Sequence, residues 1–158
     1  LMRQYLDNSS TQWITISEET KMLTNYLNLE VMLNNDNISF ELSTQEEDFS
    51  IPPMIIQPFV ENAIHHGLKP LGKPGLINIR FYLDNNDLIC EVIDNGIGRD
   101  KAAELSKKKE HDSKALSIIK ERLHYLSEEN GHNYHYQFTD LTQGTMVKVW
   151  LPYLEKTS

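Results

Sequence analysis

The sequence predicts an α+β fold in two layers, a mixed and mainly antiparallel sheet covered on one face by helices. Three observations support this prediction. Segments with helical spacing and segments of alternating polarity follow one another in the order α-β-α-β-β-α-β-β. Two pairs of strands are close neighbours in the chain, as in antiparallel hairpins. The 158 residues, 39% of them hydrophobic, are enough for one domain with its own core.

The first helix and the first strand follow from hydrophobic periodicity. In Ile16–Asp36, apolar residues recur at positions 23, 27 and 31 and at 22, 26 and 29, which is helical spacing. Ser17 is the expected N-cap, because its hydroxyl can accept a hydrogen bond from the first turn. Asn37–Ser43 alternates between polar and apolar residues, as a half-buried strand does.

A second helix is predicted after the connection Glu46–Pro53. It begins near Pro53, runs to about His66 and ends at Gly67, a common residue just past a helix end. Pro58 lies early in this helix, where its missing N–H costs least.

The C-terminal half contains two strand pairs, a charged segment and a third helix. Leu76–Leu83 and Leu88–Asp94 form a hairpin around the turn sequence DNND. Arg99–Lys109 is highly charged and is expected to be a mobile loop. Helical spacing follows over Ser113–Asn130, and the strands Tyr134–Asp140 and Gly144–Tyr153 complete the chain.

Composition excludes some classes of function. The net charge of −8 argues against a nucleic-acid-binding protein, which normally has a basic face. No apolar run approaches the roughly 20 residues that a membrane-spanning helix needs. The single cysteine, Cys90, excludes an intramolecular disulfide and favours a reducing cytoplasm. Because the net charge is negative, an anionic ligand would need a metal, a helix N-terminus or a few local cations.

The sequence DNGIG at residues 94–98 is the first candidate for a ligand site. A dinucleotide-binding fingerprint would need a third glycine where Lys101 stands. A calcium loop counted from Asp94 would place Gly96, Gly98 and Leu105 at ligand positions, so that interpretation fails. A carboxylate at the end of a buried strand, followed by two glycines, would suit a flat ligand with an exocyclic amine, such as adenine. An ordinary Asp-Asn-Gly turn is the alternative.

A second candidate lies about thirty residues earlier, in the second helix. Glu61 and His65 are four residues apart and share a helix face, as do Asn62 and His66. The amide of Asn62 could offer a neutral oxygen to Mg²⁺, which shares its ligands with substrate phosphates. Alternatively, Asn62 is an amide at the edge of the core and both histidines lie on the surface. The adjacent histidines do not have zinc-site spacing.

Together these motifs resemble a known family. The stretches PPMIIQPFVENAIHHGL, VIDNGIGRD, SIIKERL and QGTMVKVWLP are similar to the ATP-binding half of sensor histidine kinases, within the GHKL superfamily and its Bergerat fold. The branch with a QPxVENAxxHG helix, the LytS/YehU type, is the most similar. The resemblance covers roughly residues 17–153. It implies that residues 17–158 are a histidine-kinase-like ATPase domain and that residues 1–16 are a linker from a phosphoacceptor and dimerisation domain.

The resemblance also implies roles for individual residues. Asn62 matches the asparagine that holds Mg²⁺ on the ATP phosphates, and His65 stands where the family usually has a phosphate-contacting lysine. Asp94 matches the aspartate that binds adenine. The other residues expected to bind the nucleotide are His66, Gly96, Gly98, Lys114, Leu116 and Thr145. Residues between Arg99 and Lys114 correspond to the ATP lid.

Several positions depart from the family pattern. Ser113 and Ala115 replace glycines that usually let the backbone approach the phosphates, which predicts weaker ATP binding. Histidine instead of lysine at position 65 removes a permanent cation, which Lys114 or Arg99 could supply. Where hydrolytic members of the superfamily have a catalytic glutamate, this chain has Pro58, which cannot activate water.

This pattern predicts phosphoryl transfer rather than hydrolysis. Glu61 directly precedes Asn62, so its side chain points about 100° away on the helix, where it is expected to orient His65.

The resemblance therefore implies a catalytic domain that binds ATP and Mg²⁺ and phosphorylates a histidine on an upstream domain. None of the six histidines lies in a phosphoacceptor motif. The expected partners are the upstream domain, a response regulator and a second copy of the parent protein. The expected location is the cytoplasmic side of an inner-membrane-anchored sensor. Two alternatives stay open: a pseudokinase-like module that senses nucleotide without efficient transfer, and a structural or dimerisation domain.

Overall fold

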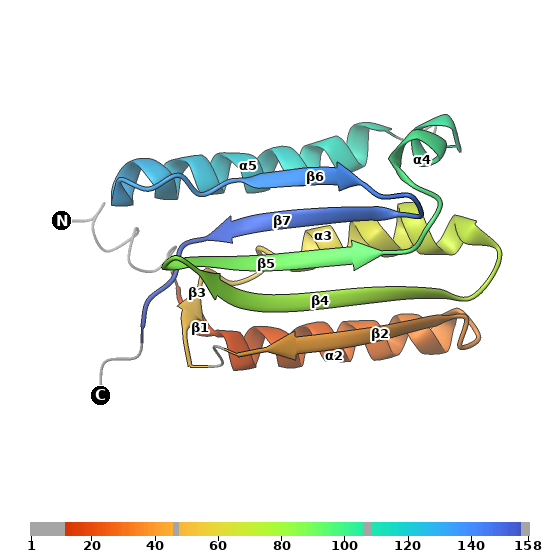
Figure 1. Ribbon diagram of the computed structural model, residues 1–158, viewed down its shortest axis with the longest axis horizontal. Coiled ribbons are helices and arrows are strands. Elements are labelled where there is room, and N and C mark those ends of the chain that lie inside the picture. The colour runs from red at the N-terminus through yellow and green to blue at the C-terminus, as the bar shows by residue number, and fades with distance from the viewer. Residues whose placement is uncertain (1–11, 46–47, 106–108, 156–158) are drawn as a thin grey trace.

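A computed structural model describes residues 12–45, 48–105 and 109–155 as a five-stranded sheet with helices on one face (Figure 1). The helices are α2 (Ile16–Leu33), α3 (Gln57–Asn62), the π-helix η1 (Ala63–Leu68), the 3-10 helix η2 (Lys69–Leu71), α4 (Arg99–Leu105) and α5 (Lys109–Asn130). The strands are β1 (Ile14–Thr15), β2 (Ile38–Thr44), β3 (Ser50–Ile51), β4 (Gly75–Asp84), β5 (Asp87–Asp94), β6 (Tyr136–Asp140) and β7 (Thr145–Leu151).

The main sheet has the strand order β2-β4-β5-β7-β6. Strands β2 and β4 are parallel, and every other neighbouring pair in this sheet is antiparallel. Helices α2, α3 and α5 lie behind the sheet in the view of Figure 1. The predicted fold class, a mixed and mainly antiparallel sheet covered on one face by helices, is confirmed.

The core lies between the sheet and these helices. The alternation of β4 directs Ile77, Ile79 and Phe81 toward the helical layer, where all three are buried. Leu23 and Leu27 of α2, Phe59 of α3 and Leu123 of α5 are the helical partners in this core, together with other apolar residues. Burying each such side chain contributes about 1.5–3 kcal/mol, so the core fixes the positions of the strand ends and the helices around the functional site.

The start of the first helix differs from the prediction. Thr15, not Ser17, is the N-cap of α2: its backbone is extended, and its side chain accepts a hydrogen bond from the Glu18 amide at 3.0 Å. The reason is tertiary, because β1 pairs with β3 and ends the extended segment at Thr15. This two-stranded sheet was not predicted.

The second helix begins later and continues further than predicted. Regular helix starts at Gln57 instead of Pro53, with Pro58 in its first turn. Gly67 does not end the helical backbone, which continues through η1 and η2 as far as Leu71. The left-handed residue that follows is Gly72, with φ of 73°.

The expected loop Arg99–Lys109 is partly helical. Its first seven residues form α4, and α5 begins at Lys109 rather than at Ser113. Residues 106–108 and the greater part of the expected linker, residues 1–11, lie outside the described residues. Within the described ranges, no helix has both the length and the apolar character required to cross a bilayer.

Candidate functional site

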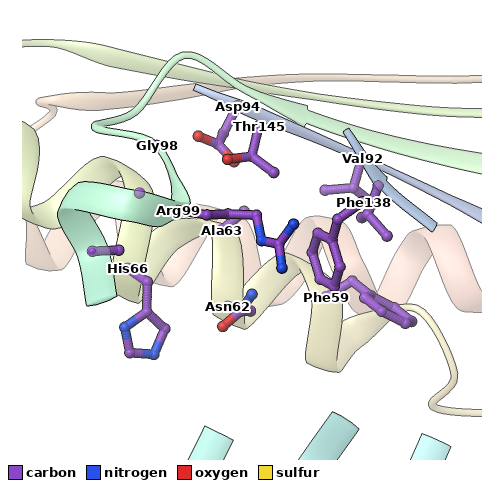
Figure 2. Close-up of a pocket in the computed structure, with 13 residues that line it drawn as sticks. Phe59, Asn62, Ala63, His66, Val92, Asp94, Gly98, Arg99, Phe138 and Thr145 are labelled. Atoms are coloured by element: carbon purple, nitrogen blue, oxygen red, sulfur yellow. The ribbon is translucent and has the colours of Figure 1, made fainter. Parts of the chain in front are cut away.

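A small pocket lies where the last residue of β5 meets the π-helix η1 (Figure 2). It is lined by residues of α3, η1, β5, α4, β6 and β7 and of the loop after β5: Phe59, Asn62, Ala63, His66, Gly67, Val92, Asp94, Gly98, Arg99, Ala102, Phe138, Thr145 and Val147. Its open volume is about 40 Å³, enough for only a few water molecules. The walls are mostly apolar, and the polar side chains among the lining residues are those of Asn62, His66, Asp94, Arg99 and Thr145.

Asp94 is a buried carboxylate at one end of the pocket. It is 5% exposed, and its Oδ1 accepts a hydrogen bond from the Gly96 amide at 2.9 Å. Burial raises the pKa of Asp94 to about 6, and the backbone amides of Gly96 and Thr145 partly oppose this increase. The structure therefore places an acceptor with little hydration at the end of an apolar pocket, where a ligand N–H would bind well.

The raised pKa of Asp94 predicts a pH-dependent stability. Because its folded-state pKa is about 6 and its ordinary value is 3.8, the folded protein binds this proton more tightly than the unfolded chain does. The free energy of unfolding should therefore fall as the pH rises from about 4 to about 6, and change little above that.

Asp94→Asn removes this titration. We expect its stability advantage over the unmutated chain to grow by up to about 3 kcal/mol across that pH window. Urea unfolding of both proteins at pH 4.5, 5.5 and 7 would measure it. An equal difference at all three pH values would contradict the assignment.

Three glycines allow the backbone segments around Asp94 to approach one another closely. A Cβ on Gly67 would lie 2.8 Å from Asp94 Oδ1, and a Cβ on Gly96 would lie 2.3 Å from the Gly67 carbonyl. A Cβ on Gly144 would lie 1.9 Å from the Asp94 carbonyl oxygen. Gly67 was predicted as a helix end, but it is needed for this contact between η1 and the β5 end.

Gly98 has a different role in the site. Its φ is 89°, a left-handed conformation that favours glycine, and an added Cβ would meet nothing within 4 Å. The loop before it is held by the Ile97 amide, which donates to the Gly67 carbonyl at 3.1 Å. The Gln143 side chain also donates to the Gly96 carbonyl at 2.7 Å. Gly98 thus turns the chain from this fixed loop into α4, along the pocket.

Asn62 and His66 also line the pocket, as do the predicted Thr145, Gly98 and Asp94. Figure 2 shows Asn62 across the pocket from Asp94 and Thr145. Asn62 is the last residue of α3 and His66 belongs to η1, so the helical turn between them directs both toward the same opening. The structure therefore brings together the two motifs that were about thirty residues apart in the sequence.

Glu61 and His65 do not line the pocket. His65 Nδ1 is 3.1 Å from the Lys69 ammonium, which also pairs with Glu30 of α2 at 3.3 Å. Burial and the Lys69 charge lower the pKa of His65, so it is neutral at pH 7. Glu61 accepts a hydrogen bond from Gln57 at 3.1 Å.

The hydrogen-bond partners seen here are therefore Gln57 for Glu61 and Lys69 for His65. The negative charge of Glu61 still acts to raise the pKa of His65, against the larger effects of burial and Lys69. The expected orientation of His65 by Glu61 stays a prediction.

The other predicted residues lie at the start of α5. Lys114 and Ala115 are exposed, and Leu116 packs partly against the core, where the Tyr136 hydroxyl donates to its carbonyl at 3.4 Å. None of these three residues lines the pocket. The side chain of Ser113 is outside the described residues.

Several pocket residues were not predicted. Phe59, Val92, Phe138 and Val147 form apolar walls, and from sequence they are indistinguishable from other core residues. Arg99 was considered only as a possible source of positive charge. The feature that could have identified it is its position directly after Gly98, since the residue that follows a pocket-lining turn is also close to the pocket.

The residues present suit a flat ligand with a hydrogen-bond donor at one end and a cation-bound anionic group at the other. No group of three or more histidine, cysteine, aspartate or glutamate side chains in the described ranges could hold a metal by itself. Asn62 offers one neutral oxygen, which fits Mg²⁺ only if a ligand's phosphates supply further oxygens. A magnesium–nucleotide complex satisfies both conditions.

Comparison with known proteins identifies relatives among sensor histidine kinases. The chain is 32% identical over 162 residues to the sensor protein LytS of Oceanobacillus iheyensis, an alignment covering 96% of this chain and 27% of that protein. It is 29% identical to LytS of Staphylococcus saprophyticus, covering 96% of the chain and 26% of the relative. The chain thus spans about a quarter of the length of these relatives. No family model matches it.

Solved structures of histidine kinases share the fold. The catalytic domain of histidine kinase ThkA aligns with a TM-score of 0.64 and 17% identity, covering 89% of this chain and 94% of that one. The histidine kinase domain of a blue-light-activated kinase from Erythrobacter litoralis aligns with a TM-score of 0.62 and 14% identity, covering 88% of this chain and 61% of that one.

Proposed function

Because the chain is a relative of the LytS-type sensor histidine kinases with the fold of a histidine kinase catalytic domain, we propose that it is the ATP-binding catalytic domain of such a kinase. It binds Mg-ATP and transfers the γ-phosphoryl group to a histidine on an upstream domain of the parent protein. No finding favours the alternative of a module that binds ATP without transfer.

One observation supports this function above the others: Asp94 and Asn62 line the same pocket from opposite sides. The buried carboxylate of Asp94 can accept a hydrogen bond from the exocyclic amine of adenine. The apolar side chains of Phe59, Val92 and Val147 suit the faces of the ring. Asn62 then lies on the side of the pocket toward which the phosphates of ATP would extend.

The protein's contribution to the reaction is mainly positioning and charge stabilisation. Asp94 and Thr145 would hold the adenine end, and Asn62 would provide one oxygen ligand for a bound magnesium ion. When bound, magnesium neutralises charge on the phosphate oxygens. The acceptor nitrogen attacks phosphorus in line, the P–O bond to the β-phosphate breaks, and ADP leaves with that electron pair.

Phosphoryl transfer, not hydrolysis, fits the residues around Asn62. Pro58 carries no group that could deprotonate water, and the carboxylate of Glu61 is hydrogen-bonded to Gln57. No acid is therefore placed to activate water from the helix that carries Asn62. This supports a catalytic domain that protects its phosphoryl donor until an acceptor histidine arrives.

The parent protein supplies the remaining parts of the system. The LytS relatives are about four times as long as this chain. The acceptor domain and a membrane anchor are therefore proposed to lie in the remainder of the parent protein. A second copy of the parent protein is the proposed dimer partner. A response regulator is the proposed downstream partner. The ThkA structure in complex with response regulator protein TrrA, with a TM-score of 0.58 to this chain, supports that proposal.

The test begins with nucleotide binding by this chain. Mg-ATP at about 100 times its Kd should raise the Tm by roughly 5–10 °C, since saturation to that degree contributes about 2.7 kcal/mol. EDTA or Asn62→Ala should each weaken ATP binding about tenfold, and the two effects should not add. Asn78→Ala, on β4 outside the pocket, is the matched control. No Tm change at millimolar Mg-ATP would contradict the proposed function.

A second measurement tests transfer. Label from γ-labelled ATP should appear on the acceptor region of the parent protein when that region is mixed with this chain. It should not appear on this chain alone. Binding without transfer to the acceptor region would instead support the nucleotide-sensing alternative.

A further inference from the structure

Arg99 crosses the pocket in this structure. Its guanidinium carbon is 4.6 Å from the centroid of the Phe138 ring, and its Nη1 is 4.0 Å from Asp140 Oδ1. Figure 2 shows the side chain passing between Asp94 and Thr145 on one side and Asn62 on the other. Arg99 therefore occupies space between the two groups that would hold opposite ends of a nucleotide.

The pocket must open for a nucleotide to enter. Its volume of about 40 Å³ is far below the roughly 300 Å³ or more that is typical of small-molecule sites. Most of its walls cannot move easily: Phe59, Val92 and Val147 are buried in the core, and Gly67 is in close contact with Asp94. The side chain of Arg99 is 53% exposed, so it can move at a lower cost than the buried side chains of the walls.

The same arginine is the available cation for phosphates. Among the described residues that line the pocket, Arg99 is the only lysine or arginine. His65, at the position of the phosphate-contacting lysine, is neutral and faces Lys69 instead. In a chain with a net charge of −8, the polyphosphate needs such a local cation.

We propose that Arg99 has two positions: on Phe138 in the empty pocket, and on the phosphates when ATP is bound. Adenine displaces the guanidinium from the Phe138 ring, and the side chain exchanges its weak ion pair with Asp140 for charge-assisted hydrogen bonds to phosphate oxygens. Arg99 therefore opposes binding of an adenine group alone and favours binding of the triphosphate, which makes it a specificity-determining residue. This inference rests on the proposed ATP-binding function.

The two positions predict opposite effects of one substitution. Arg99→Ala should tighten the binding of adenosine about threefold, because no cation–π contact must be broken. It should weaken Mg-ATP binding about tenfold or more, because the phosphate contacts are lost. Isothermal titration calorimetry with both ligands on the unmutated chain and the variant would measure a change of about 30-fold in the ratio of the two Kd values.

Three further variants separate this proposal from a general loss of charge or of fold. Arg99→Lys should stay within about threefold of the unmutated chain for Mg-ATP, because a lysine ammonium also binds phosphate, as a point charge. Asp140→Asn weakens only the resting position, so it should tighten both ligands about twofold. Lys21→Ala, which removes an exposed cation of α2 outside the pocket, should change neither Kd by more than about twofold.

Equal fold-changes for adenosine and Mg-ATP in Arg99→Ala would overturn the proposal while leaving ATP binding itself established. Unchanged Mg-ATP binding in that variant would also overturn it. If the unmutated chain binds neither ligand, the proposed function fails and this inference fails with it.

Discussion

Asp94→Asn should abolish measurable ATP binding while leaving the empty domain at least as stable as the unmutated chain. The amide oxygen of asparagine can still accept the Gly96 N–H, so the loop after β5 is preserved. The new NH₂ group, however, places a donor where the adenine amine also donates. Losing a charge-assisted hydrogen bond and adding this mismatch should weaken binding about 100-fold or more.

Thermal unfolding with and without Mg-ATP would measure both parts of this prediction. The variant should show no ligand-induced shift, and its ligand-free Tm should equal or exceed that of the unmutated chain. Asp87→Asn, at the opposite end of the same strand, is a matched control that should keep the full shift. An Asp94→Asn protein that binds ATP with near-normal affinity would exclude Asp94 as the adenine-binding group.

Gly96→Ala should destabilise the protein more than Gly67→Ala does. These are the two glycines around Asp94 whose backbone angles are also accessible to alanine. A Cβ on Gly96 would lie 2.3 Å from the backbone carbonyl of Gly67, and neither segment can yield easily. The Ile97 amide ties the loop to the Gly67 carbonyl, and Gly67 itself is in contact with Asp94. Separating them should cost about 3 kcal/mol or more and should also remove ATP binding.

Gly72→Ala provides the comparison for this prediction. Gly72 has φ of 73° but nothing within 4 Å of an added Cβ, so the substitution should cost only about 1 kcal/mol of backbone strain. It should keep the nucleotide-induced Tm shift. Urea unfolding of both variants would measure the difference, and equal losses of stability would show that steric contact at Gly96 is not the cause.

The sequence by itself determined the fold class and the two ends of the pocket. Apolar residues recur every 3.6 residues in a helix and every 2 in a strand, and these periods depend only on local backbone geometry. The ends of α2, β4 and β5 were therefore predicted to within a few residues. Each motif alone also allowed an ordinary turn or an amide at the edge of the core. The roles of Asp94 and Asn62 were predicted because the two motifs together resemble the ATP-binding half of sensor histidine kinases. Their shared pocket could only be an expectation, since thirty residues of chain separate them.

The tertiary structure decided how the residues between these motifs are used. Gly67 resembles a helix end in sequence, yet the helical backbone continues through it. Glycine is needed there because a Cβ would meet the Asp94 carboxylate. His65 contacts Lys69 instead of lining the pocket, although the neighbouring His66 lines it. Arg99 rests on Phe138 because the start of α4 and β6 meet at the pocket. Periodicity reports which face of an element is apolar, but contacts between elements distant in sequence depend on how their backbones pack.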